Sequence, residues 1–338
     1  MGKLMRIKRR DVLRAGLLGG VGLAIGGSFP VHAQGASRKI NIVNTSGGTN
    51  LVLATIMKQQ GIFEQFGLEA TITNVSDGAK LMGGILTGEM DICPLSGFGQ
   101  VFPAIEKGAK MKVLAGGAIL PMQAILTTKP DIKTLKDLEG RTIGTGSLGA
   151  LIHQMCVAAL SKAGIDDSKV NFVNIGSATD IFRAVAAGTV DAGSSEIWQI
   201  GKNNTRALDG GRFWLDIPDY TYQAGFASDG VIQNKRETLV RALAAYAKLY
   251  RFIQDGDSKE AFLKGFAAGM GKPDDEAALE QWTFYQKVKP FASSLVLSQQ
   301  KIDYMQNLNV SFKIQSKVLP FEKVADMSIA NDAIKMLA

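Results

Sequence analysis

Hydrophobic and polar positions follow the same order in two stretches of this chain. Aligned at an offset of 100 residues, "TITNV" (71–75) matches "NFVNI" (171–175), and both alternate as a half-buried strand does. The segments that follow, 76–88 and 177–189, space their apolar residues along one helix face and have a glycine where a helix should stop. A second short strand comes next in each copy, so the pattern predicts a repeated strand–helix–strand unit.

Each unit is preceded by a further strand, a loop of Gly, Ser and Thr, and a long apolar helix, over residues 39–61 and 140–164. Strands that alternate with helices form mostly parallel sheets with helices on both faces. We therefore predict an α/β protein with two lobes of similar design, each a mixed, mostly parallel sheet flanked by helices.

The rest of the chain is expected to complete the first lobe. Residues 111–117 and 123–130 have the pattern of further strands, which we assign to that lobe. From Lys235 onward the pattern is helical, and this block is expected to pack on the same lobe. The chain would then cross between the lobes twice, near 127–130 and near 222–228. The predicted lobes are residues 38–126 with 228–338, and residues 127–227.

Residues 1–33 have the pattern of an export signal. A basic stretch precedes the apolar run Ala15–Phe29, which is too short and too rich in glycine to span a membrane. Val31–Ala33 provides a small-residue cleavage site, so we expect cleavage near Ala33 and a mature protein in the periplasm.

The twin arginines Arg9 and Arg10 resemble the bacterial twin-arginine signal. Lys8 and Val12 depart from the usual residues of that motif, so Sec export stays an alternative.

Net charge does not indicate a nucleic-acid partner. The chain carries a formal charge of +7, but residues 1–33 hold six basic residues against Asp11 alone. The remainder, with 32 basic and 30 acidic residues, offers no basic face for phosphates. Cys93 and Cys156 fall in different predicted lobes and in apolar runs, so we expect buried thiols and no bridge.

Polar loops at the carboxyl ends of the predicted strands are the candidate binding elements. Ligands of open α/β sheets bind at these ends, and helix N-termini there offer free N–H groups. The loops are rich in Ser, Thr, Asn and Gly and almost free of Lys and Arg. The candidate donors are Ser46, Thr49, Asn50, Ser96, Ser147, Ser194 and Ser195.

Each of these serines also has a purely structural explanation, as the cap of its own helix. Phe98, Trp198 and Tyr222 would supply an apolar wall, although Trp198 fits a core position equally well. Glu196, the one charged candidate, would either cap a helix or accept from a ligand N–H. If these polar loops of the two lobes face each other, they would form a cleft that closes on a small molecule by a hinge motion.

These features resemble the substrate-binding proteins of ABC transporters, in the nitrate, sulfonate, taurine and thiamine-pyrimidine-precursor group. The resemblance covers roughly residues 38–310 and rests on "GEMDI", "GTVDA", "IKTLKDLEGRTIGTGSLG" and "LVRALAAYAKLYRFI". It implies a two-lobe periplasmic-binding-protein fold (type II-like), a small-molecule ligand and a partner ABC permease and ATPase. A monomer is the default of the family, and no cofactor or metal is implied. Transferred to this chain, the ligand contacts are Ser46, Gly47, Gly48, Thr49, Asn50, Ser96, Gly97, Phe98, Ser147, Leu148, Ser194, Ser195 and Glu196.

No Lys or Arg stands in these loops to hold a nitrate or sulfonate. A larger organic acid or a heteroaromatic compound therefore fits at least as well as a small, highly charged anion.

Other functions remain as alternatives. "GTGSLG" (Gly144–Gly149) matches the dinucleotide fingerprint, but the strand 170–175 ends on Asn174 and Ile175 instead of the acid that would bind a ribose. A hydrolase would have to use His153, the only histidine after the signal segment. An enzyme of the cysteine desulfinase or pyrimidine synthase type is another alternative, in which Cys93 would be the candidate nucleophile. A ligand sensor for a membrane partner is the third alternative.

Overall fold

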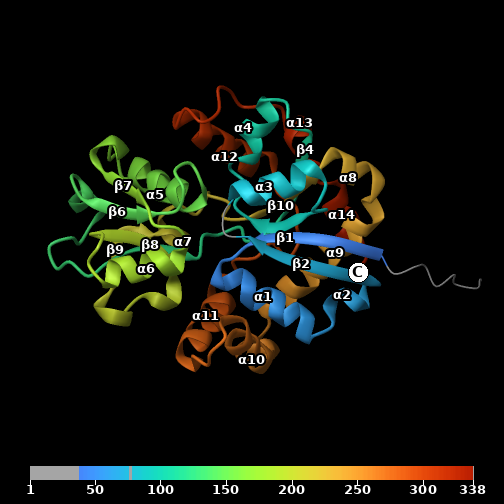
Figure 1. Cartoon of the computed structure of the whole chain (residues 1–338), viewed down its shortest axis with the longest axis horizontal. Helices are drawn as coiled ribbons and strands as arrows, with labels where there is room; N and C mark the ends of the chain where they lie inside the picture. The colour runs from blue at the N-terminus through green and yellow to red at the C-terminus, as the bar shows by residue number, and fades with distance from the viewer. Residues whose placement is uncertain (1–37, 76–77, 338) are drawn as a thin grey trace, which may run out of the picture. The chain divides into compact units, whose positions relative to one another are not determined.

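The computed structural model describes residues 38–75 and 78–337 (Figure 1). The predicted signal segment, residues 1–33, lies outside them. No helix of the described part is long and apolar enough to cross a membrane.

The first sheet has the strand order β2-β1-β3-β10-β4. β1 and β2 pair in parallel, and a parallel bridge from Ile42 to Ile92 joins β1 to the start of β3. β10 lies antiparallel between β3 and β4. The strands are β1 (Arg38–Thr45), β2 (Leu68–Val75), β3 (Cys93–Ser96), β4 (Met111–Gly116) and β10 (Ala224–Ser228).

The second sheet repeats this design with the order β7-β6-β8-β5-β9. β6 is parallel to β7 and β8, and β5 lies antiparallel to β8 and β9. The strands are β5 (Gln123–Thr127), β6 (Thr142–Thr145), β7 (Asn171–Asn174), β8 (Ala192–Glu196) and β9 (Arg206–Arg212). The predicted α/β fold with two halves of similar topology is confirmed.

One strand lies in a different sheet from the one predicted. The segment 123–130 was expected in the first lobe, but β5 pairs with β8 and β9 in the second sheet. Alternation identifies a strand but not its partners, and all five residues of β5 are buried between two neighbours. The chain therefore enters the second sheet before Gln123 and returns to the first before Ala224.

Helices cover both sheets. Those of the two repeated halves are α1 (Gly48–Gln59), α2 (Ile62–Gln65), α3 (Gly78–Thr87), α4 (Val101–Glu106), α5 (Leu151–Lys162), α6 (Ala178–Ala186) and α7 (Phe213–Asp216). The C-terminal block has α8 (Asp229–Asn234), α9 (Arg236–Ile253), α10 (Lys259–Met270), α11 (Asp275–Val288), α12 (Gln299–Ser311), α13 (Phe321–Val324) and α14 (Ser328–Lys335).

The C-terminal block packs mainly on the first half. α10 contacts α1, α14 contacts α9 and β4, and α9 contacts β1 and β2. Aromatic side chains fill this part of the core: Phe291 stacks on Tyr250 at 5.1 Å between ring centroids and meets Tyr285 edge-on at 5.0 Å. α11 also contacts the short turn Ile197–Gln199 of the second half.

The glycines of the repeated Gly-x-x-Asp motifs end helices. Gly88 follows α3 with φ of +75° and Gly188 follows α6 with φ of +70°. Glycine adopts this left-handed conformation without a side-chain clash, so the chain can leave each helix and turn into the next strand.

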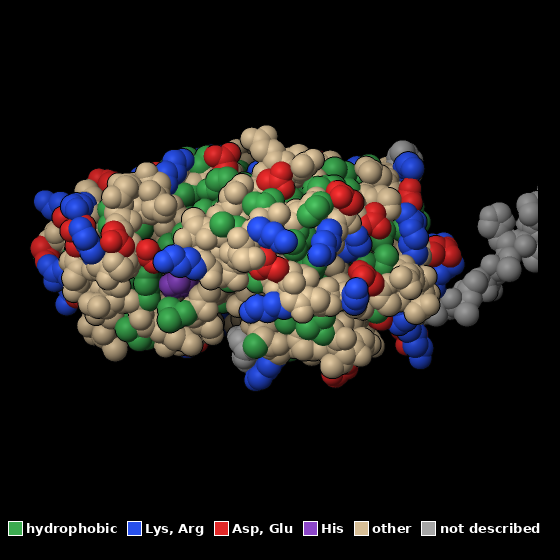
Figure 2. Space-filling model, turned by 90° about the horizontal axis from the view of Figure 1, so that it is seen from above, with side chains coloured by type: hydrophobic (Ala, Val, Ile, Leu, Met, Phe, Trp, Pro, Cys, Tyr) green, Lys and Arg blue, Asp and Glu red, His purple; other side chains and the backbone are tan. Residues whose placement is uncertain are grey.

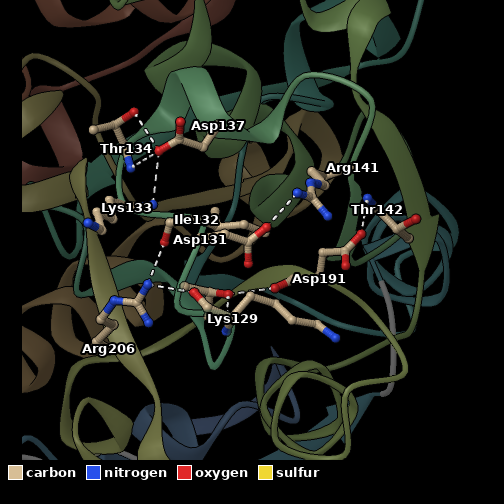
Figure 3. A network of polar contacts seen from close by, with 11 residues as sticks. Lys129, Asp131, Ile132, Lys133, Thr134, Asp137, Arg141, Thr142, Asp191 and Arg206 are labelled. Carbon is tan, nitrogen blue, oxygen red and sulfur yellow. Dashed lines mark hydrogen bonds and ion pairs between the residues drawn. The ribbon is translucent and has the colours of Figure 1, made fainter.

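The aspartates of these motifs fix the start of a strand. Asp91 Oδ2 accepts from the N–H of Asn41 at 2.9 Å, and the Asp91 N–H donates to the Asn41 carbonyl at 2.8 Å. Asp191 and Thr142 make the same pair at 2.9 and 3.0 Å (Figure 3). The repeated motif therefore sets the register between β1 and β3 in the first half and between β6 and β8 in the second.

Figure 3 also shows how the turn after β5 is held. The Arg206 guanidinium donates to the carbonyls of Lys129 and Ile132 at 2.5 and 2.7 Å, and Arg141 pairs with Asp131 at 2.6 Å. These contacts tie the turn to β9 and to the start of β6.

Removing the Asp191 carboxylate should destabilise the second half. Asp191→Ala leaves the Thr142 N–H without its acceptor, so we expect a loss of about 1–3 kcal/mol in the free energy of unfolding. Urea unfolding followed by circular dichroism measures the loss. Asp209→Ala, at an exposed aspartate of the same sheet, is the matched control; equal stability of both variants would contradict this role.

Candidate functional site

A cavity of about 580 Å³ lies between the two sheets. It is lined by the ends of β1, β6, β7 and β8, by the starts of α1, α5 and α6, and by the segments that cross between the sheets. Parallel strands of both halves end at this boundary between the halves, which we call the seam. Their polar loops therefore face one another.

Two helices begin at the cavity without a side-chain cap. Gly47 precedes α1 and Ala150 precedes α5, and neither helix has an acidic residue in its first turn. Both of these residues line the cavity. The first-turn N–H groups and the positive ends of the helix dipoles are therefore available to an acceptor group of a ligand.

Glu196 is a buried carboxyl group at the end of β8. Its Oε2 accepts from Thr49 Oγ1 across the seam at 3.5 Å, and Thr49 accepts from Gln281 Nε2 of α11 at 3.3 Å. Burial raises the pKa of Glu196 to about 8, and the Thr49 hydrogen bond opposes this only in part. The described residues that line the cavity include no Lys or Arg, so this carboxyl is mainly protonated at neutral pH.

Tyr222 and Gln123 form a second polar group in the wall. Gln123 Nε2 donates to the Tyr222 hydroxyl oxygen at 3.1 Å, and Gln123 Oε1 accepts from Ser194 Oγ at 2.8 Å. Because the Tyr222 oxygen accepts here, its own hydrogen can be donated to a ligand. Ser194 fixes the orientation of the Gln123 amide from behind.

About half of the predicted contacts lie at the cavity. They are Ser46, Gly47, Thr49, Asn50, Gly97, Ser147, Glu196 and Tyr222.

The other predicted contacts point elsewhere. Gly48, Ser96, Phe98, Leu148, Ser194, Ser195 and Trp198 are not part of the cavity lining. Ser96 Oγ bonds to the Thr45 N–H at 3.2 Å, and Ser195 Oγ donates to the Ala178 carbonyl at 2.7 Å. These hydroxyls satisfy buried backbone groups.

The two aromatic residues away from the cavity belong to the core. Phe98 packs edge-on against Phe102, and Trp198 against Phe266. Gly48 lies beneath Trp198, since a Cβ there would lie 3.3 Å from its ring.

Most of the amide side chains in the cavity wall were not predicted from the sequence. The further polar residues that line the cavity are Thr45, Gln100, Gln123, Gln154, Asn174, Ser177, Asp180 and Gln223. Thr45 and Asn174 end strands β1 and β7, Gln100 and Ser177 precede helices, and the others come from helix α5 or α6 or from the crossing segments. Gln123 carried one usable signal, because it is a polar residue at the start of an otherwise apolar strand.

Leu148 instead lines a second cavity of about 540 Å³ at the seam, together with His153 and Lys313. His153 Nδ1 accepts from the Gly149 N–H at 3.1 Å, and burial lowers its pKa. Figure 2 shows the histidine, in purple, at the surface beside a basic side chain and hydrophobic side chains.

Neither cysteine is placed for chemistry. Cys93 in β3 and Cys156 in α5 are free and fully buried, and burial raises the pKa of each thiol to about 12. Neither lines the cavity. Within the part of the chain that the structure describes, no group of His, Cys, Asp and Glu side chains is arranged for a metal ion.

Comparison with known proteins places this geometry in a class. The family model described as "NMT1/THI5 like" matches residues 49–257. No curated protein matches the sequence.

Solved structures match most of the chain. The periplasmic aliphatic sulphonate binding protein SsuA from Escherichia coli is 16% identical, with a TM-score of 0.67, over 86% of this chain and 92% of its own. The alkanesulfonate-binding protein SsuA from Xanthomonas axonopodis pv. citri, bound to MOPS, is 18% identical, with a TM-score of 0.67, over 85% and 95%. The desulfurization enzyme DSZB is 16% identical, with a TM-score of 0.61, over 89% and 100%.

The two sheets with a cavity at their seam thus form the periplasmic-binding-protein fold. The chain belongs to the NMT1/THI5-like family, whose model matches more than half of its residues. The fold and the family match both confirm the resemblance noted in the sequence.

The buried Glu196 should make stability depend on pH. Its pKa is raised from 4.5 to about 8, so between these values the folded protein holds a proton that the unfolded chain has released. The free energy of unfolding therefore falls as pH rises through this window, by up to about 1.4 kcal/mol per pH unit. Glu196→Gln should lack this contribution and exceed the wild type in stability most clearly at and above pH 8.

Urea unfolding at a series of pH values from 4 to 9 tests this expectation. Glu276→Gln, at an exposed glutamate of α11, is the control and should follow the wild type. A Glu196→Gln profile parallel to that of the wild type would show that Glu196 is ionised in the folded protein.

Proposed function

We propose that this protein is a periplasmic solute-binding protein that captures one small organic molecule in the cavity and delivers it to an ABC importer. The observation that supports this most directly is the cavity itself, which lies between the two halves and is lined by polar groups from both. Its volume of about 580 Å³ is in the range of small-molecule sites.

The wall chemistry favours a ligand with an acceptor group at one end and hydrogen-bonding atoms at the other. The uncapped starts of α1 and α5 suit a carboxylate, sulfonate or ring acceptor. Glu196, Gln123 and Tyr222 suit the polar atoms of an organic acid or a heteroaromatic ring. Because no basic side chain lies among the described lining residues, a larger ligand with dispersed charge is favoured over nitrate or a small sulfonate.

The names of similar proteins support this class of ligand. Two are sulfonate-binding proteins, one of them bound to MOPS, and a variant of DSZB is described in complex with biphenyl-2-sulfinic acid. Another is the ligand-binding component of an ABC-type import system from Staphylococcus aureus. With the predicted export signal, these names support a permease and ATPase as partners of a periplasmic protein; a monomer is our expectation from the family resemblance alone.

The enzyme alternative is less well supported. DSZB shares the fold, but the candidate nucleophile Cys93 is buried in β3 and its raised pKa keeps the thiol protonated. The described cavity lining has no Cys or His, so a bound molecule should be released unchanged.

A thermal-shift screen of the mature chain from Gln34 onward tests binding. Alkanesulfonates, aromatic carboxylates and aminopyrimidines are the compounds to compare, and a specific ligand should raise the melting temperature. Mass spectrometry after incubation should return the hit intact; conversion of the hit to a product would favour the enzyme.

Ser147→Ala is expected to weaken binding of that hit by about three- to tenfold, because it removes one hydroxyl from the wall. Isothermal titration calorimetry measures the change. Ser161→Ala, an exposed serine near the end of α5, is the matched control and should bind as the wild type does. Equal affinity in both variants would remove Ser147 from the site.

A further inference from the structure

The two halves approach each other closely at a pair of glycines. A Cβ on Gly99 would lie 2.2 Å from Gln154 Oε1, and one on Gly97 would lie 2.7 Å from Leu151 Cβ. Neither glycine has a positive φ, so no turn requires glycine there. What requires it is the contact between the loop after β3 in the first half and the first turn of α5 in the second.

Gln154 makes hydrogen bonds with both ends of its amide, and the bond to Asn309 of the C-terminal block crosses this contact. Its Nε2 donates to Asn309 Oδ1 of α12 at 2.9 Å, and its Oε1 accepts from the Tyr220 hydroxyl at 3.3 Å. Asn309 Nδ2 in turn donates to the Gly99 carbonyl at 2.7 Å. Gln154 is 3% exposed and Asn309 1% exposed, so water cannot easily replace these bonds while the seam is closed.

Asn309 is held in position by the C-terminal block. Its Nδ2 also lies 3.4 Å from Gln315 Oε1, and Gln315 Nε2 donates to Gln306 Oε1 at 2.9 Å. Gln306 Nε2 donates to the Leu319 carbonyl at 3.1 Å. This chain of buried amides belongs to the first half alone, so the acceptor for Gln154 is in place before the halves meet.

We propose that Gln154 stabilises the closed arrangement of the two halves even without a bound molecule. Its side chain occupies the space that Gly99 leaves open and hydrogen-bonds α5 to Asn309 of the other half. Gln154 also lines the cavity, so the same side chain forms part of the wall and closes it. Its meaning for ligand capture rests on the proposed function, but closure can be measured without any ligand.

The test compares three variants: Gly99→Ala, Gln154→Ala and the double variant. Spin labels on Lys58→Cys in α1 and Lys162→Cys in α5 report the separation of the halves by pulsed electron resonance. Both native thiols are buried and should not be labelled. Unfolding, dialysis and refolding beforehand remove any molecule that copurifies.

The wild type is expected to show a population at the closed distance. Gly99→Ala should lower it at least as far as Gln154→Ala does, because the added methyl group displaces the Gln154 amide and breaks its hydrogen bonds. Gln154→Ala should lower the ratio of closed to open molecules about fivefold, through its lost hydrogen bonds. The double variant should close as well as Gln154→Ala does, because the truncated side chain makes room for the methyl group.

Three results would overturn the proposal: a wild type without a closed population, a Gln154→Ala variant as closed as the wild type, or a double variant more open than Gln154→Ala. Asn309→Ala removes the partner without adding atoms and should match Gln154→Ala; an unchanged closed fraction there would also count against it. Gln300→Ala, exposed on α12, is the control. Circular dichroism checks that each variant folds, and a failed ligand screen would leave these distances unaffected.

Discussion

Each half of the molecule depends on a reciprocal pair of hydrogen bonds between an aspartate and the backbone of a neighbouring strand. Asp91 with Asn41 fixes where β3 starts relative to β1, and Asp191 with Thr142 fixes where β8 starts relative to β6. A one-residue slip would turn every side chain to the opposite face and move the strand ends away from the seam. The cavity exists where it does because these pairs set both sheets in register.

Much of the fold follows from local patterns in the sequence. The repeat at an offset of 100 residues, the glycine stops and the helical block after Lys235 all correspond to elements of the structure. The partners of β5 did not follow, because a strand buried on both sides has the same composition in either sheet. Its place depends on long-range pairing with β8 and β9, which periodicity does not contain.

The candidate site was predictable only where a loop carried its signal. Thr49 and Asn50 lie in the first turn of α1 and Ser147 in the loop after β6, and all three line the cavity. Ser96 and Ser195 lie at the ends of β3 and β8, and their hydroxyls turn inward to buried backbone groups. Gln154 sits on a helix whose apolar positions gave no reason to single it out, and its importance comes from the approach of Gly99 and Asn309.

The position of β5 and β10, the strands that follow the two crossings between the sheets, has a consequence for biosynthesis. β5 and β10 are interior strands of their sheets, since each lies between two neighbours. The second sheet is built from one continuous stretch, Gln123 to Arg212, and can assemble as soon as that stretch is available. The first sheet must wait for Ala224–Ser228, so the half that begins the chain is the later of the two to be completed.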